Sequence, residues 1–202
     1  GTFGDPRYRQ RAVFMASEDN WMISEGTHNY VISNHMDPHD IASDKLYSHT
    51  YSATTAQVHA AFNNGRLFGV YSGHGGTTGW SDGPPFSADD VRSLTNDLDY
   101  GWVSSFACLT GRFIEDECFM ETWIRTPRAG AAVAMGSSVN SFWNEDDIME
   151  RKMFDLFYNS DMRELGPLMN NTKISCLGGF GQDARRYFEM YNLMGDPSLF
   201  VP

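Results

Sequence analysis

Leu67-Phe-Gly-Val-Tyr-Ser-Gly-His-Gly-Gly76 is a short apolar run that ends in a glycine-rich turn around His74. A second run, from Trp102 to Phe106, leads in the same way into Ala107 and Cys108. Short runs that are apolar on both faces are typical of central strands in a parallel sheet. The two runs therefore predict that His74 and Cys108 lie where buried strands reach the surface.

The remainder of the chain repeats this alternation of strand and helix. Arg11–Ser17 and Ala131–Met135 have the same strand pattern. Helical patterns lie at Thr55–Asn63, Ser87–Leu94, 117–125, 144–158 and 183–193. Alternating elements of this length predict a three-layer α/β/α sandwich with a mostly parallel central sheet. Repeats and linker-like tracts are lacking, so residues 1–202 are predicted to form a single domain.

Composition narrows the class of protein and partner. The 202 residues are 41% hydrophobic, enough for an ordinary core, and the formal net charge of −11 argues against a nucleic-acid partner. No apolar stretch reaches the roughly 18 residues of a membrane span. Three cysteines cannot all pair with one another. The first residues, Gly1–Pro6, show neither an initiator Met nor a secretory signal, so a processed or excised fragment is expected.

Cys108 and His74 are the strongest candidates for chemistry. A lone cysteine is more often a small buried residue than a nucleophile. Cys108, however, is followed by Leu109-Thr-Gly111 and a helical pattern, which predicts a strand-to-helix turn where nearby N–H groups lower a thiol pKa. An imidazole partner can hold a thiolate and protonate a leaving amine. A phosphate loop at His74 is an alternative, but the Lys and Ser/Thr of a P-loop are missing.

Several polar side chains are predicted at the same sheet edge. Glu18 and Asp19 directly follow the first strand, so one carboxylate is expected to accept a hydrogen bond from His74. Ser138, Asn140 and Trp143 follow the fourth strand. The Trp143 indole is suited to form the wall of a pocket for a cationic side chain.

The remaining cysteines and histidines are weaker candidates. Cys118 stands beside three acidic residues and Cys176 has no basic neighbour, so both are expected to be structural. His35 and His39 have ligand-like spacing, but Pro38 interrupts the helix that would place both rings on one face. A metal site is therefore not predicted.

A set of motifs spread along the chain carries a family resemblance. The motifs are Tyr71-Ser-Gly-His-Gly-Gly-Thr-Thr-Gly-Trp80, Phe106-Ala-Cys-Leu-Thr-Gly111, Cys118-Phe119, Gly136-Ser-Ser-Val-Asn-Ser-Phe-Trp143 and Met194-Gly-Asp-Pro-Ser-Leu-Phe200. Together they resemble the gingipain family of cysteine peptidases, which has a caspase-like fold. The ordered set covers most of the chain, from about Val13 to Val201.

The resemblance implies a role for each matching residue. Cys108 would be the nucleophile and His74 the general acid/base, with the N–H groups of Gly75 and Cys108 as the oxyanion hole. Glu18 would be the acidic residue near the histidine, and Trp143 would line the pocket for the side chain before the scissile bond. The implied activity is endopeptidase cleavage through an acyl-enzyme, after a basic residue.

Two departures from the family pattern leave alternatives open. The segment 25–29 has no aspartate in register with the one at the pocket base of basic-specific members, so Asp19 or Glu25 is expected to substitute. The family's preceding α/β subdomain is also missing, and the chain is interpreted as the second half of a larger processed peptidase. An acyl-transferring, sortase-like peptidase and a catalytically silent interaction domain remain alternatives to hydrolysis.

The resemblance also bears on cofactors, partners and location. No cofactor is expected to be required, although calcium is predicted as a possible structural ion without a named ligand set. The expected partners are a peptide or protein substrate and a second processed chain or propeptide. A secreted or cell-surface bacterial protein is expected by family resemblance.

Overall fold

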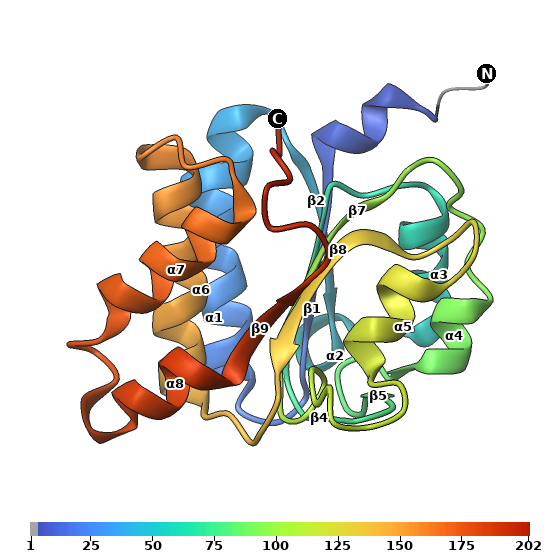
Figure 1. Ribbon diagram of the computed structural model, residues 1–202. Coiled ribbons are helices and arrows are strands. Elements are labelled where there is room, and N and C mark those ends of the chain that lie inside the picture. The colour runs from blue at the N-terminus through green and yellow to red at the C-terminus, as the bar shows by residue number, and fades with distance from the viewer. Residues whose placement is uncertain (1–3) are drawn as a thin grey trace.

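The computed structural model describes residues 4–202 as three layers, with a six-stranded sheet between two layers of helices (Figure 1). The strand order is β2-β1-β3-β7-β8-β9, and only β9 runs antiparallel to its neighbour. The strands are β1 Arg11–Ala16, β2 Ala42–Tyr47, β3 Phe68–Ser72, β7 Gly101–Phe106, β8 Ala131–Ser137 and β9 Tyr191–Met194. The predicted α/β/α sandwich with a mostly parallel sheet is confirmed.

The helices cover both faces of this sheet (Figure 1). One face carries α1 Trp21–Val31, α6 Trp143–Asn159, α7 Leu165–Cys176 and α8 Ala184–Met190. The other carries α3 Thr55–Asn63, α4 Ala88–Arg92 and α5 Phe119–Arg125. The short elements are α2 Ser48–Tyr51, a π-helical turn Ile32–Met36, 3-10 turns Pro6–Gln10, Asp37–His39 and Gly181–Asp183, and a small sheet of β4 Gly75–Gly76, β5 Gly79–Trp80 and β6 Phe86–Ser87.

Side-chain alternation along the central strands divides the core in two. In β1, Ala12 and Phe14 belong to the cluster under α1, α6 and α7, whereas Val13 and Met15 belong to the cluster under α3 and α5. All four side chains are fully buried. Burial on both faces explains why the strand reads as a continuous apolar run, and it ties the loops at the strand ends to a rigid sheet.

Most predicted elements are found within a few residues, but the chain end differs. The helix predicted at 183–193 stops at Met190, and Tyr191–Met194 forms strand β9 against β8. Helices α1 and α7 and strand β2 were not predicted, because their apolar residues follow neither a clear helical nor a clear strand period. Ser87 and Asp90 form a capping box at the start of α4, in which the Ser87 N–H donates to Asp90 Oδ2 at 2.8 Å.

A buried His–Glu pair joins α1 and α6 to β1. His28 Nδ1 lies 2.7 Å from Glu150 Oε1, and His28 Nε2 lies 3.1 Å from the Met15 carbonyl oxygen. Both ring nitrogens therefore lie within hydrogen-bond distance of an oxygen atom. Both side chains are almost fully buried.

Breaking this pair is expected to destabilise the whole fold. Glu150→Ala leaves a buried polar ring without its hydrogen-bond partner, so the free energy of unfolding should fall by about 2 kcal/mol or more. Denaturant unfolding measures this change. The exposed Glu189→Ala on α8 is the control, and equal stability of the two variants would contradict the assignment.

Candidate active site

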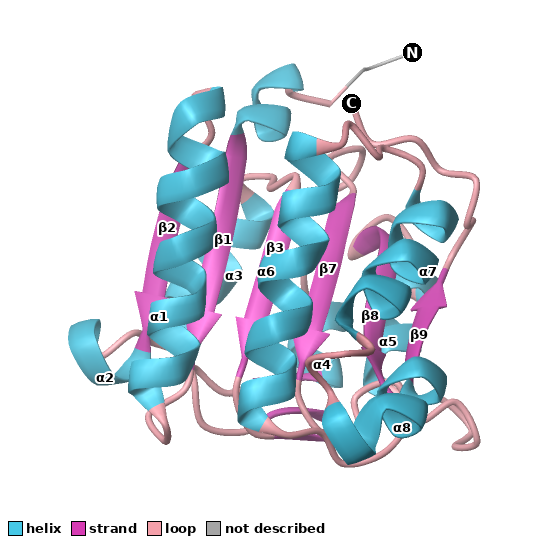
Figure 2. Ribbon diagram, turned by 90° about the vertical axis from the view of Figure 1, so that its left-hand side faces the viewer, coloured by secondary structure: helices cyan, strands magenta, loops and turns pink. Residues whose placement is uncertain are grey.

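The carboxyl ends of β1, β3, β7 and β8 lie together along the lower edge of the sheet in Figure 2. The loop after β1 carries Asp19, the loop after β3 carries His74, and the turn after β7 carries Cys108. Residues 138–142 follow β8. Parallel pairing in this strand order brings side chains to one edge although they lie up to 120 residues apart in the chain.

His74 is held by hydrogen bonds on three sides. Its Nε2 lies 3.0 Å from Asp19 Oδ2, its backbone N–H donates to Asp82 Oδ1 at 3.0 Å, and its carbonyl accepts the Tyr71 hydroxyl at 2.7 Å. The hydrogen bond from His74 lowers the pKa of Asp19. Since Nε2 is engaged by Asp19, Nδ1 is the ring nitrogen that remains for proton exchange.

Asp19, and not Glu18, is the carboxylate at the histidine. The Glu18 carboxylate instead lies 3.3 Å from His49 Nδ1, next to α2. Residues 18–20 form a turn after β1, which lies between β2 and β3 in the sheet. In this turn the Glu18 carboxylate points toward His49 and the Asp19 carboxylate toward His74. The role that the family resemblance implied for Glu18 is wrong for this geometry.

Cys108 lies in a turn that presents its thiol beside the loop after β8. The side chain is partly exposed, and Sγ lies 3.8 Å from the Ser141 carbonyl oxygen. The next residue, Leu109, has a φ of +61°, an unfavourable conformation for a non-glycine residue. Its N–H donates to the Val139 carbonyl at 3.1 Å, which stabilises the turn. The Cys108 N–H itself has no hydrogen-bond partner within residues 4–202.

Gly75 approaches the cysteine turn closely. A Cβ atom at this position would lie 2.9 Å from Thr110 Cγ2, 3.0 Å from Ala107 Cβ and 3.3 Å from the Cys108 carbonyl oxygen. Only glycine fits without movement of these atoms. The backbone after His74 therefore packs directly on the segment that carries the thiol.

One small cavity connects these groups. Its volume is about 50 Å³, and it is lined by Gly73, His74, Cys108, Ser141, Phe142, Trp143 and Asp146. The Trp143 ring meets the His74 ring edge to face, with 5.4 Å between centroids. A thiol and an imidazole at one cavity can form an ion pair and exchange a proton with a group bound there.

Asp146 is a buried carboxylate in this cavity that the sequence did not single out. Its position in the first turn of α6 resembles ordinary acidic capping of a helix. In the fold, Oδ1 accepts the Tyr191 hydroxyl at 2.6 Å and the Tyr187 hydroxyl at 3.0 Å. Burial raises the pKa of Asp146 to about 7. Those tyrosines come from α8 and β9, so only tertiary contacts distinguish Asp146 from its partly buried neighbours Glu145 and Asp147.

The residues predicted to bind substrate fall in different places. Trp143 lines the cavity beside Cys108, whereas Ser138 lines a second cavity against α8. Asn140 presents its carbonyl oxygen to Arg186. Asp19 is engaged by His74, and Glu25 accepts hydrogen bonds from the Thr50 N–H and hydroxyl. Neither Asp19 nor Glu25 lines the cavity beside Cys108, so neither replaces the pocket aspartate.

The other thiols and the acidic residues form no further reactive site. Burial raises the pKa of Cys118 and of Cys176 to about 11 each, so both remain thiols near neutral pH. Across the described residues, no three His, Cys, Asp or Glu side chains gather to hold a metal ion. The structural calcium ion stays a prediction. No described helix is long and apolar enough to cross a membrane.

Comparisons with known proteins identify the family of this chain. Residues 3–202 match the family model of peptidase family C25. Lys-gingipain of Porphyromonas gingivalis is 31% identical over 152 residues, which are 72% of this chain and 8% of that protein. Gingipain R2 of the same organism is 26% identical over 157 residues, which are 73% of this chain and 21% of that protein.

Solved structures show the same fold. The crystal structure of the Arg-specific cysteine proteinase gingipain R superposes with a TM-score of 0.87 at 22% identity, covering 99% of this chain and 49% of that one. A complex of gingipain pro- and mature domains gives a TM-score of 0.87 at 22% identity, over 99% of this chain and 50% of that one. The chain thus spans about half of these structures and a smaller share of the curated relatives. The caspase-like fold is confirmed, and this chain belongs to peptidase family C25.

Proposed function

We propose that this chain is the catalytic unit of a cysteine endopeptidase. The observation that carries the proposal is the single cavity lined by both Cys108 and His74, with His74 fixed by Asp19. Membership of peptidase family C25 supports the same reaction. Asp19 acts as the positioning residue that keeps the imidazole in one orientation.

The reaction begins with attack of the Cys108 sulfur on the carbonyl carbon of the scissile bond. His74 accepts the thiol proton and then delivers it to the departing amine, leaving a thioester on Cys108. The N–H groups of Cys108 and Gly75 stabilise the oxyanion of the tetrahedral intermediate. Water, activated by His74, then hydrolyses the thioester and restores the free thiol.

Asp146 supports a preference for a basic side chain before the scissile bond. It lines the cavity beside Cys108, and Trp143 supplies an aromatic wall. A carboxylate enclosed in such a site favours an ammonium or guanidinium group, while an indole face packs on its aliphatic stem. The names Lys-gingipain and Arg-specific gingipain R agree with this class of substrate.

The loop after β8 supports binding of the substrate backbone. The N–H groups of Asn140 and Ser141 have no hydrogen-bond partner within residues 4–202. The carbonyl groups of an extended peptide can accept hydrogen bonds from these two N–H groups, as in strand addition. This pairing would align the residues before the scissile bond along 139–142.

The relatives also support proposals about the extent of the catalytic region, a partner and the location of the protein. The match to about half of each gingipain structure supports this chain as one unit of a longer catalytic region. The complex of pro- and mature domains supports a propeptide as a partner. The gingipain relatives support an extracellular or cell-surface location.

Active-site labelling tests the proposal. A peptidyl chloromethyl ketone ending in lysine should add one label, mapped to Cys108 by mass spectrometry, and His74→Ala should slow this reaction by about 100-fold or more. Cys118 and Cys176 serve as internal controls because both are buried. Equal labelling of the His74→Ala variant would overturn the pairing. An added amine that captures the acyl group in place of water would indicate acyl transfer.

A further inference from the structure

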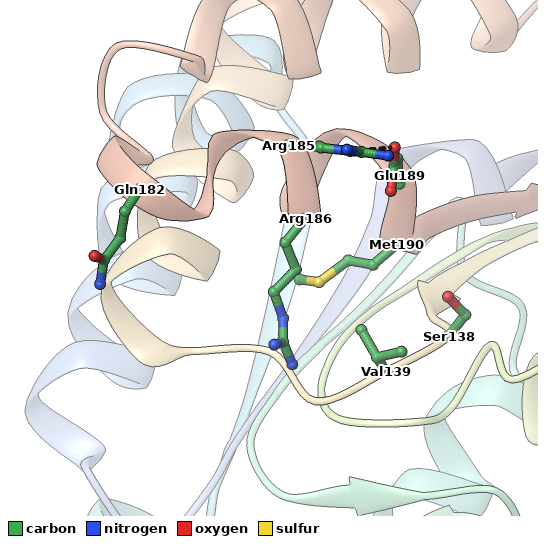
Figure 3. A pocket seen from close by; sticks show the side chains of 7 residues that line it. All are labelled: Ser138, Val139, Gln182, Arg185, Arg186, Glu189 and Met190. Atoms are coloured by element: carbon green, nitrogen blue, oxygen red, sulfur yellow. Dashed lines mark hydrogen bonds and ion pairs between the residues drawn. The ribbon is translucent and has the colours of Figure 1, made fainter.

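A wider cavity lies on the other side of the 138–142 segment, under α8 (Figure 3). Its volume is about 520 Å³. It is lined by Ser138, Val139, Gln182, Arg185, Arg186, Glu189 and Met190. Its charged residues are two arginines and one carboxylate, Glu189.

Arg186 is held in position while part of its guanidinium stays free. Its Nε and Nη2 groups donate to the Asn140 carbonyl oxygen at 3.2 and 2.6 Å, and its Cζ lies 5.0 Å from the Phe142 ring centroid. Nη1 has no hydrogen-bond partner in the described part of the chain. Figure 3 shows the side chain directed from α8 to the loop. An arginine ordered before binding loses little entropy when it meets a carboxylate.

The charge of Arg186 is not neutralised within the protein. Of the twelve arginines, only Arg9 and Arg186 have no carboxylate within 4.0 Å among residues 4–202. Arg185, the adjacent residue, differs in this respect because its Nε donates to Glu189 Oε1 at 2.9 Å. Figure 3 shows these two side chains together, away from the loop.

Arg186 lies on the side of Cys108 where the residues before the scissile bond would bind. Along the sheet edge the order is Asp19 after β1, His74 after β3, Cys108 after β7, and then the 138–142 loop and α8. His74 protonates the leaving amine, so the departing part of the substrate lies on the His74 side of the thiol. Residues before the scissile bond lie on the opposite side, toward α8.

The spacing fits the residues just before the bond. Cys108 Sγ lies 3.8 Å from the Ser141 carbonyl oxygen, and the adjacent Asn140 carbonyl contacts Arg186 at 2.6 Å. An extended chain advances about 3.3 Å per residue. A side chain two to four residues before the scissile bond therefore reaches Arg186.

We propose that the α8 cavity is a second specificity subsite, which accepts an acidic side chain two to four residues before the scissile bond through Arg186. The inference rests on the proposed function, since it needs a peptide bound at Cys108. The combined substrate would carry a basic residue at the bond and an acidic residue shortly before it. Asp146 would then bind the basic side chain, and Arg186 would bind the acidic side chain.

Peptide cleavage with matched variants tests this subsite. Each peptide has Lys or Arg directly before the scissile bond. Glu, Gln or Lys is placed at one of the three preceding positions at a time, and kcat/KM is measured for every peptide. At one position Glu should be preferred over Gln by about 5-fold, and Lys should be poorest. Arg186→Gln keeps a donor for Asn140 and should bring the Glu/Gln ratio to about 1, while Arg186→Lys retains part of it.

The ratio separates recognition from loop positioning. Arg185→Gln on the same helix is the matched control and should keep the Glu preference, because that guanidinium is already paired with Glu189. An equal loss for Glu and Gln peptides in Arg186→Gln, or no Glu preference in the unaltered chain, would overturn the inference. If no peptide is cleaved, the proposed function fails, and binding of the same peptides to Cys108→Ala by fluorescence anisotropy then decides the subsite alone.

Discussion

Replacing Cys108 by alanine should lower kcat for peptide cleavage by about 10⁴-fold or more, because the acyl-enzyme can no longer form. The remaining hydrogen-bond donors around the cavity would supply only residual catalysis. The fold should persist, since the side chain is partly exposed at a turn and not in the core. Cleavage of a Lys/Arg peptide mixture, followed by mass spectrometry, measures the loss.

A second thiol provides the control for this experiment. Cys118→Ala removes a buried sulfur from the N-terminus of α5 and should leave kcat within about 2-fold, with a modest loss of stability. Cleavage by the Cys108→Ala variant at the rate of the unaltered protein would rule out the nucleophile. Loss of folding in Cys108→Ala, detected by circular dichroism, would contradict the expectation that the fold of this variant persists.

Replacing Asp146 by asparagine should reduce the preference for Lys or Arg before the scissile bond by about 100-fold. Asparagine has nearly the same volume and can still accept the Tyr191 hydroxyl, so the change removes mainly the charge. The preference is the ratio of kcat/KM for a peptide with Lys to that for the same peptide with Met. Asp147→Asn, whose side chain contacts Thr27 and Arg151 outside the cavity, is the matched control.

The same carboxyl group predicts how specificity changes with pH. Burial raises the pKa of Asp146 to about 7, so the carboxylate fraction grows as pH rises through that value. The Lys/Met ratio should therefore increase between about pH 5.5 and 8 and stay flat in Asp146→Asn. Any effect of pH on the chemical step is common to both peptides and cancels in the ratio. A flat ratio in the unaltered protein would contradict the role of Asp146.

The pH dependence of protein stability is an independent test of the raised pKa of Asp146. A carboxyl group whose pKa is higher in the folded than in the unfolded chain stabilises the fold at acid pH, and this contribution is lost as pH rises from about 4 to about 7. Asp146→Asn removes the dependence, so its Tm relative to the unaltered protein should be higher at pH 8 than at pH 4. Thermal unfolding at the two pH values measures the difference.

The central sheet was predictable because its strands are buried on both faces. Runs such as Leu67–Tyr71 are continuously apolar, and glycine-rich or small residues mark where each run ends. Peripheral elements were not predictable in the same way. Strand β2 alternates between partly buried and exposed residues, and β9 was assigned to a helix because Tyr191–Met194 continues the apolar pattern of α8.

The amino-acid sequence by itself determined that His74 and Cys108 follow buried strands of a mostly parallel sheet, since local pattern and turn residues are enough to define a strand end. Only the tertiary structure decided which side chains meet there. Asp19 rather than Glu18 faces His74 because the turn after β1 directs the two carboxylates apart, and Asp146 is buried at the cavity because tyrosines from α8 and β9 enclose it. Such contacts join residues far apart in the chain, and no local period of side chains encodes them.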